Sequence, residues 1–593
     1  MKYPKLRAKA HDKQYIDTFG GYNHNPRIGD GEFYDVANMS ADEYPLLKVR
    51  KPHGVYNEGK FYGMISKDEL CYVAAGDLVI GNKRVQLGLS SGQKTLVSMG
   101  AYVIIFPDKM YVNTADPELT DYGYIAAQCG GTGATVSNCT QDGTQIPSNH
   151  ITISETQPED GINGYYWINT STAPATMFRY SGESGQWFDV KSYIRISSEH
   201  ITDDFSAGDS VQVGGFIKDG YDLDGYYSIA AAGIDQSVIG GVQKRFIAVP
   251  GIVAEISVAF DTEFTISRDA PDMDFVIEAN NRLWGCKYGY VDGKLVNEIY
   301  ASKLGDFKNW RNYAGISTDS YAASVGTDGP FTGAVNYGGY PMFFKERCVH
   351  KVYGSMPSSF QIQTDMLYGV QEGCGQSLAI VNEVLYYKSR TGICAYDGSF
   401  PSLVSENLGN ETYNQAIAGA FRSKYYVAMK QYGIQYGFVY DTSKRIWHKW
   451  QIPEVVTQFC AHGDELYFIT SPAFADSFIG TVYGSGTESD FSEKKVYWSA
   501  ESGMLGLNTP DKKTLVSLDL RMLVELGSKV KLFIQYDSNG HWHPFSSIVG
   551  KGIQVVNIPI IPRRCDHFRI KIEGEGPATL FSICKTIEEG TEL

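Results

Sequence analysis

The sequence predicts an all-β protein: a β-propeller of about seven blades with an inserted β domain and a C-terminal β sandwich. One observation is a strand pattern that recurs about every 40 residues between residues 376 and 485, in which Tyr396, Tyr440 and Tyr483 recur at nearly equal intervals. The other is composition: 13% of the residues are aromatic and 63 of the 593 are glycine, which suits strands joined by tight turns. Amphipathic helical runs are scarce, so we expect little helix.

Each copy of the pattern holds two apolar, aromatic strands. The first strands are predicted at 384–387, 424–427 and 465–469, and the second strands at 392–398, 436–441 and 480–484. A four-stranded unit of this length cannot bury both faces alone, so copies must pack on one another in a ring. Counting partial units gives about seven blades, with six and eight also compatible.

In chain order, the sequence divides into five predicted parts. Residues 1–55 are rich in turns and read as an extended arm, which in ring folds can supply the outer strand of the last blade. Residues 56–114 form the first blades, 115–264 the inserted β domain, 265–500 the remaining blades and 501–593 the β sandwich.

The insertion and the sandwich are predicted from changes in this rhythm. After Asn113 the chain becomes rich in Gly, Thr, Ser and Asp, with candidate strands at 165–168 and 226–229, and it is far too long for a loop. A Ser, Gly, Asn and Pro containing hinge at 499–510 precedes the alternating strands of the C-terminal part.

The charge and the cysteine content limit the classes of function that the sequence allows. The formal net charge is −15 with no block of Lys and Arg, which argues against electrostatic binding of nucleic-acid phosphates. Ten cysteines without a Cys-x-x-Cys pair indicate buried thiols in a reducing compartment, with a disulfide conceivable only between Cys129 and Cys139. We expect no signal peptide, because residues 1–12 are charged, and no membrane insertion, because no long apolar run occurs.

Known catalytic patterns are missing from the sequence. Sialidase and WD-repeat signatures, a phosphate-binding glycine loop and a Gly-x-Ser-x-Gly elbow are not found. Asp272, Asp274 and Glu278 could serve as paired carboxylates for glycoside hydrolysis, but a polar turn entering a strand is the favoured explanation of this stretch. We therefore predict that the chain is not an enzyme and uses no cofactor.

The C-terminal part holds candidate residues for a metal site and for an interface. His541, His543, Cys565 and His567 could converge on zinc, but their spacing matches no standard motif, so no metal is predicted. Arg563 and Arg564 form the one dense cationic spot there, suited either to carboxylates at an interface or to a solvated strand end. The predicted interface residues are Arg563, Arg564, Tyr22 and Tyr44.

Several stretches resemble bacteriophage tail proteins. They are Phe19-Gly20-Gly21-Tyr22-Asn23, Gly31-Glu32-Phe33-Tyr34-Asp35, Tyr44-Pro45-Leu46-Leu47, Asn281-Arg282-Leu283-Trp284-Gly285-Cys286, Ala301-Ser302-Lys303-Leu304-Gly305-Asp306-Phe307, Phe343-Phe344-Lys345-Glu346 and Arg563-Arg564-Cys565-Asp566-His567-Phe568-Arg569. The chain is similar to the propeller proteins called nozzle, stopper or tail-stabilising proteins, which close the head-to-tail channel.

This resemblance implies a structural virion protein, made in the host cytoplasm. It implies a homo-oligomeric ring, commonly sixfold, that docks portal or adaptor and tail fibre proteins and lets DNA pass without sequence-specific binding. An acidic wall would suit that passage, since it repels phosphates. The alternatives are a host-surface glycan-binding or depolymerising tail protein, whose Tyr- and Trp-rich insertion stacks on sugars, and an intracellular interaction scaffold.

Overall fold

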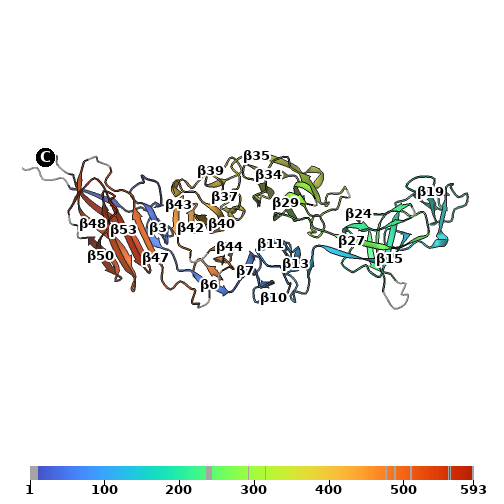
Figure 1. The fold of residues 1–593 in the computed structure, drawn as a ribbon, viewed down its shortest axis with the longest axis horizontal. Helices are drawn as coiled ribbons and strands as arrows, with labels where there is room; N and C mark the ends of the chain where they lie inside the picture. The colour runs from blue at the N-terminus through green and yellow to red at the C-terminus, as the bar shows by residue number, and fades with distance from the viewer. Residues whose placement is uncertain are drawn as a thin grey trace, which may run out of the picture.

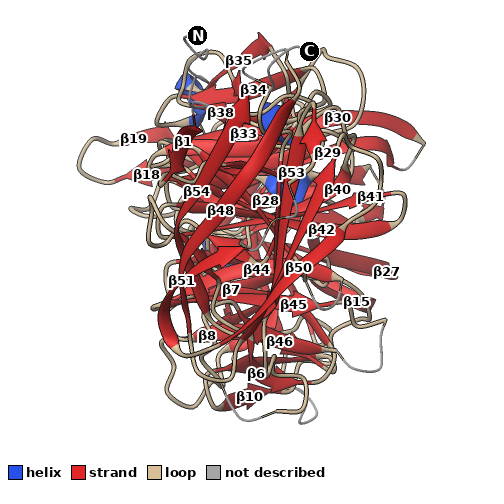
Figure 2. Ribbon diagram, turned by 90° about the vertical axis from the view of Figure 1, so that its left-hand side faces the viewer, coloured by secondary structure: helices blue, strands red, loops and turns tan. Residues whose placement is uncertain are grey.

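The protein consists almost entirely of β-strands arranged in many small sheets. The computed structural model describes residues 11–589 except 219, 236–242, 292, 314, 453–454, 474–476, 487–488, 508–510, 559 and 561. Within these residues the helical segments are the short 3-10 turns η1 (Ser148–His150), η2 (Pro357–Ser359), η3 (Gly375–Ser377) and η4 (Glu406–Leu408) (Figure 2). The all-β prediction is confirmed. No helix in the part of the chain that the structure describes is long and apolar enough to cross a membrane.

The middle of the elongated molecule holds seven four-stranded antiparallel sheets (Figure 1). The first two are β7 (Phe61–Ser66), β8 (Leu70–Ala74), β9 (Asp77–Ile80) and β10 (Lys83–Val85), then β11 (Thr95–Met99), β12 (Tyr102–Phe106), β13 (Met110–Asn113) and β14 (Tyr122–Tyr124). The third and fourth are β28 (Phe275–Ala279), β29 (Arg282–Val291), β30 (Lys294–Ala301) and β31 (Tyr321–Ser324), then β32 (Gly333–Tyr337), β33 (Tyr340–Phe344), β34 (Cys348–Tyr353) and β35 (Gln361–Met366).

The aromatic repeat supplies the remaining three sheets. The fifth and sixth are β36 (Ala379–Val381), β37 (Val384–Lys388), β38 (Ile393–Tyr396) and β39 (Ser402–Leu403), then β40 (Asn414–Phe421), β41 (Lys424–Gln431), β42 (Ile434–Asp441) and β43 (Ile446–Trp450). The seventh combines β44 (Val456–His462), β45 (Glu465–Thr470) and β46 (Phe478–Thr481) with β6 (Gly54–Glu58) from the N-terminal part.

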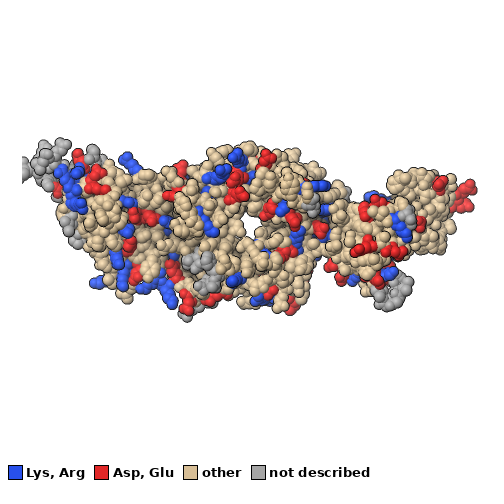
Figure 3. Space-filling view, in the orientation of Figure 1, with Lys and Arg blue, Asp and Glu red and all other residues tan. Residues whose placement is uncertain are grey.

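The first strands of successive sheets lie against one another. Strand β7 contacts β11, β11 contacts β28, β28 contacts β32, β32 contacts η3 beside β36, β36 contacts β40, and β40 contacts β44. Strand β44 in turn contacts β7. The last sheet therefore lies beside the first, and the surface of this region is hollowed in its middle (Figure 3).

The insertion forms its own sheets between the second and third of these units. Its seven-stranded sheet has the order β24 (Gly225–Ser228), β21 (Ser210–Gly214), β27 (Ser257–Arg268), β15 (Ala127–Cys139), β20 (Tyr193–Ser198), β26 (Arg245–Pro250) and β25 (Ala231–Ile234). Smaller sheets are β16 (Ile151–Ser154), β17 (Tyr166–Asn169), β18 (Thr176–Ser181) and β19 (Gln186–Asp189), and β22 (Ile217–Lys218) with β23 (Tyr221–Asp222). Residues 122–124, which the sequence placed in the insertion, pair with β13 because β14 completes the second sheet.

Two sheets form the body at the C-terminal end. One holds β1 (His11–Ile16), β4 (Met39–Ser40), β5 (Leu47–Val49), β48 (Lys513–Val524), β51 (Gly552–Ile558), β52 (Arg564–Cys565) and β54 (Ala578–Glu589). The other holds β2 (Gly21–Tyr22), β3 (Glu32–Ala37), β47 (Tyr497–Ser502), β49 (Lys529–Tyr536), β50 (His543–Val549) and β53 (Phe568–Glu575). The segment predicted as an extended arm thus supplies strands to both sheets.

A buried ion pair fastens this terminal body to the neighbouring sheets. The Arg50 guanidinium, 3% exposed, donates to both carboxylate oxygens of Glu493 at 2.6 and 3.0 Å. The same carboxylate accepts a hydrogen bond from the His53 backbone N–H at 3.0 Å. Arg50 also lies over the Trp450 ring of β43. Removing the carboxylate would leave a buried cation without its partner.

We expect Glu493→Gln to lower the free energy of unfolding by about 3 kcal/mol, because one member of a buried pair is neutralised. Chemical denaturation followed by tryptophan fluorescence measures it. The matched control is Glu43→Gln, which removes the partner of Lys48 in an exposed pair and should cost less than about 1 kcal/mol. Equal effects of the two substitutions would contradict the role given to Arg50.

Candidate functional site

A cavity of about 520 Å³ lies where several of the small sheets begin their first strands. Its lining comes from the third to seventh sheets and includes Phe275, Thr332, Gly375, Gln415 and Val456. Glu372 and Lys430, of opposite charge, are also among the lining residues. Five separate sheets therefore build one concave surface, which is the usual setting of a ligand site.

A second cavity of about 550 Å³ adjoins the first and shares Pro330 and Glu372 with it. Asp328 and Glu346 also line it. The Glu346 Oε1 atom accepts a hydrogen bond from the Glu372 backbone N–H at 3.2 Å, so these two residues lie together. Carboxylates gathered at a cavity wall can accept hydrogen bonds from hydroxyl groups or attract a cation.

Lys345 forms part of the floor of this second cavity and is 2% exposed. Its ammonium donates to Asn297 Oδ1 at 2.9 Å and to the Thr327 carbonyl at 2.7 Å. It also lies 4.7 Å from the centre of the Phe331 ring. Burial lowers the pKa of Lys345, because the charged form loses its hydration.

His350 of β34 lies near Lys345 and is fully buried. Its Nε2 and Nδ1 atoms are each 2.9 Å from a threonine hydroxyl, those of Thr327 and Thr364. Burial, with a further contribution from Lys345, lowers the pKa of His350 to about 4. The imidazole is therefore neutral near pH 7 and connects Thr327, in the loop before β32, to Thr364 of β35.

The carboxylates singled out by sequence lie elsewhere. Asp272 pairs with Lys109 at 2.7 Å, and Asp274 pairs with Lys287 at 2.8 Å and accepts from the Tyr288 backbone N–H. Glu278 accepts from the backbone N–H of Asn281 at 2.8 Å. None of the three lines either cavity. Each is instead engaged in stabilising turns and sheet contacts.

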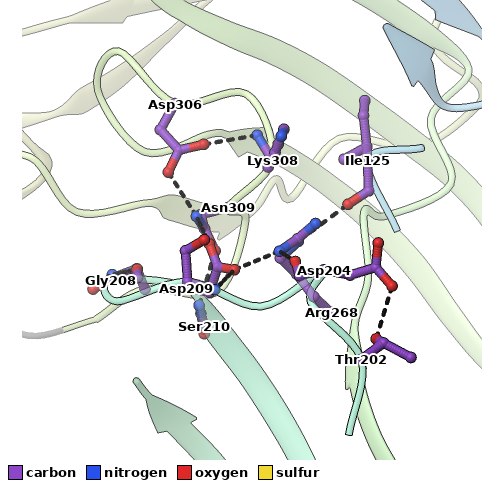
Figure 4. Close-up of polar contacts among 12 residues, drawn as sticks. Ile125, Thr202, Asp204, Gly208, Asp209, Ser210, Arg268, Asp306, Lys308 and Asn309 are labelled. Carbon is purple, nitrogen blue, oxygen red and sulfur yellow. Dashed lines mark hydrogen bonds and ion pairs between the residues drawn. The ribbon is translucent and has the colours of Figure 1, made fainter. Parts of the chain in front are cut away.

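A polar network joins the insertion to the third small sheet (Figure 4). The Arg268 guanidinium of β27 pairs with the Asp209 carboxylate and both side chains are nearly buried. Asn309 donates to Asp209 at 3.1 Å and to Asp306 at 2.6 Å, and accepts from the Ser210 backbone N–H at 2.8 Å. Loop 302–320, which follows β30, is thereby tied to the root of the insertion.

The predicted interface residues occupy different environments. Tyr22 is 2% exposed and packs beside Phe438, so its side chain contacts its own chain and is not presented at a surface. Tyr44 is 44% exposed. Arg563 and Arg564 are exposed, and Arg563 lies over the Tyr536 ring. Of the four predicted interface residues, Tyr44, Arg563 and Arg564 are thus exposed and Tyr22 is not.

The structure also shows where the residues considered for a zinc site and for a disulfide lie. Cys565 is buried, and its pKa is raised to about 11 by burial. His567 contacts Asp566 and Ser538 through its two ring nitrogens. The described residues contain no group of three or more His, Cys, Asp or Glu side chains suited to a metal ion. Cys129 and Cys139 are free and stand at opposite ends of β15, about 30 Å apart, which is too far for a disulfide.

The chain is similar to several solved structures at low sequence identity. No family model matches the chain, and no curated protein does. Exo-β-1,3-galactanase from Phanerochaete chrysosporium is 8% identical, covering 52% of this chain and 94% of its own, with a TM-score of 0.21. A glycoside hydrolase is 11% identical, covering 52% and 96%, with a TM-score of 0.21. An acylaminoacyl peptidase is 10% identical, covering 75% and 58%, with a TM-score of 0.20.

The sequence led us to predict that the chain is not an enzyme. The solved structures that it is similar to include glycoside hydrolases, and this finding contradicts the prediction. The prediction relied on missing motifs, yet glycoside hydrolysis needs only two suitably placed carboxylates, which carry no fixed sequence signature. We therefore withdraw the prediction that the chain is not an enzyme.

We expect the buried neutral histidine to make the protein acid-sensitive. Below pH 6.5 the unfolded chain binds a proton that His350 in the folded state does not bind until about pH 4. Stability is therefore lost as the pH falls through this window, by up to about 1.4 kcal/mol per pH unit for this side chain. In His350→Asn the free energy of unfolding, measured by chemical denaturation at pH 7, 6 and 5, should fall less steeply as the pH is lowered. His541→Asn, at an exposed position, is the control and should show the same dependence of unfolding free energy on pH as the unaltered protein. The same dependence in His350→Asn would contradict the role given to His350.

We expect Asp209→Asn to loosen the attachment of the insertion, because Arg268 would remain buried without a countercharge. The loss should be about 3 kcal/mol, seen as faster proteolytic cutting near residues 120–127 and 268–275. Asp203→Asn is the control, since its partner Arg245 is 3.4 Å away in an exposed pair. Cleavage as slow as in the unaltered protein would show that the network does not hold the junction.

Proposed function

We propose that the chain is a structural subunit of a bacteriophage tail, a nozzle or head-to-tail connector that assembles with further copies into a ring around the DNA exit channel. The observation that carries the proposal is a free, apolar sheet edge on the terminal body. Strand β51 ends one sheet and β50 ends the other, and within the described chain neither has a second strand neighbour. Unpaired edges favour association with another chain.

Exposed apolar side chains border these two edges. Val549 ends β50, Ile553 and Val555 point outward from β51, and Leu526 lies in the turn before β49. Each of the four is more than half exposed. Apolar side chains clustered on an otherwise polar surface mark protein interaction sites.

The opposite side of the terminal body is already occupied. Strands β2 and β4, which end the two sheets there, lie against β43 of the sixth small sheet. The free edge therefore points away from the rest of the molecule. A second copy meeting this edge with a different surface would form a heterologous contact, which generates a ring when the rotation closes.

We further propose that the seven small sheets are the blades of a closed β-propeller. The succession of contacts from β7 through β44 and back to β7 supports closure. The pairing of β6 with β46 supports it too, because the last blade then takes its outer strand from the N-terminal side. Four strands in each of seven sheets favour seven blades over six or eight.

The distribution of charge suits a wall that DNA passes. Residues 127–268 contain seven Lys and Arg against seventeen Asp and Glu, a formal net charge of −10 out of the −15 of the whole chain. Such a surface repels phosphates, so DNA would slide along it without being held. Portal or adaptor and tail fibre proteins would be the partners, in a virion assembled in the host cytoplasm, and a sixfold ring is the expected symmetry.

We expect the purified chain to form an assembly whose native mass is a whole multiple of 65.6 kDa, six copies if the symmetry is as proposed. The double variant Ile553→Asp/Val555→Asp should lower this mass to that of one chain, because two charges enter the apolar contact. Tyr432→Asp, at an exposed hairpin tip, is the control. Native mass spectrometry measures the three proteins; a stable monomer in the unaltered chain would refute the ring.

A further inference from the structure

The small sheet at the far tip of the insertion has two unlike faces. Strands β16 to β19 alternate their side chains between the faces. Ile168 and Met177 point to one face, where they form a core cluster with Ile146. The other face carries Trp167, Phe178, Tyr180 and Trp187, none of which belongs to a core cluster of the described residues.

The four rings form one continuous shelf. Trp167 and Phe178 are cross-strand partners and stack with ring centres 4.9 Å apart. Trp187 meets Trp167 edge-on at 6.1 Å and Tyr180 at 5.2 Å. Trp167 is buried beneath its neighbours, whereas Phe178 and Trp187 remain partly exposed. The outer surface of the shelf is therefore aromatic and reachable from solvent.

Local contacts hold the shelf rigid. The Trp167 indole N–H donates to the Ser154 carbonyl and hydroxyl at 3.1 and 3.0 Å, which fixes the ring at the centre of the sheet. The backbone of Gly161 lies on the Tyr180 ring so closely that a Cβ at this position would come within 2.1 Å of a ring carbon. A preformed aromatic surface loses little side-chain freedom when a ligand stacks on it.

Polar groups border the same face. Asp189 is exposed and is the cross-strand partner of Phe178, and Thr152 is exposed beside Trp167. Apolar rings flanked by hydrogen-bonding groups match a pyranose, which presents C–H groups on its faces and hydroxyls at its edges. The formal net charge of −10 over residues 127–268 disfavours ligands that carry acid groups.

We propose that the shelf of Trp167, Phe178, Tyr180 and Trp187 is a carbohydrate-binding platform for chains of neutral or amino-sugar pyranoses. A sugar ring stacks on Trp187 and Phe178, and Asp189 accepts hydrogen bonds from its hydroxyl or amino groups. Strand β19 lies at the end of the molecule opposite the terminal body (Figure 1). The platform can therefore contact a surface that lies beyond the seven four-stranded sheets in the middle of the molecule.

Calorimetric titration of the full chain tests the proposal with four probes: hexamers of glucose, N-acetylglucosamine and glucosamine, and a hexamer of a uronic acid. We expect at least one of the first three to bind with a Kd below about 1 mM, and the uronic acid hexamer to bind more weakly. Failure of all three to bind, or tighter binding of the uronic acid hexamer, would overturn the proposal.

Variants identify the surface. Trp187→Ala and Phe178→Ala should each weaken binding about tenfold, the effect of losing one ring contact. Trp187→Tyr keeps a ring and should recover part of the affinity, which separates loss of the ligand contact from loss of folding. Trp542→Ala, at the other end of the molecule, is the control. Unchanged affinity in all platform variants would refute the site. The inference does not depend on the ring: a monomer that binds the hexamers would refute the ring and support the platform.

Discussion

The structure depends on one constraint: a small four-stranded sheet has two faces to bury and two edges to cover, and it can do neither alone. The seven small sheets in the middle of the molecule meet this constraint by packing against one another in succession, and the seventh also takes a strand from a distant segment, as the terminal body does. Strand β6 pairs with β46 across more than 400 residues, and β1 pairs with β54 across more than 550. Gly54 shows how close the approach is, because a Cβ there would lie 2.5 Å from the Ser485 carbonyl oxygen.

Local patterns in the sequence predicted the strands of the aromatic repeat well. Strands β37, β41 and β45 lie where the runs of Tyr, Val and Leu placed them, because such runs specify a buried strand whatever they pair with. The N-terminal strands were missed. Strands β2 and β4 have two residues each, too few for an alternating pattern, and their positions depend on partners far along the chain. Tyr22 was assigned to a surface for the same reason.

The sites were harder to predict than the strands. Asp209, Arg268 and Asn309 lie in different parts of the sequence and no spacing connects them, so their network follows only from the folded chain. The cavity carboxylates Glu346 and Glu372 are 26 residues apart and likewise have no spacing that predicts their contact, whereas the acidic cluster around Asp272 is visible in the sequence but lines neither cavity. The Trp- and Tyr-rich character of the insertion was visible in the sequence, but the assembly of four rings on one face required the strand register.

The shared strand β6 also has a consequence for biosynthesis. Residues 54–58 leave the ribosome long before their partner strand at 478–481 has been made. At about 5 to 20 residues per second, the N-terminal segment must wait roughly 20 to 80 s for that partner. During this interval its strand edges are open to other chains, and copies translated from one message lie close together. In newly made chains, pairing of β6 with β46 of the same polypeptide therefore competes with strand exchange between two polypeptides.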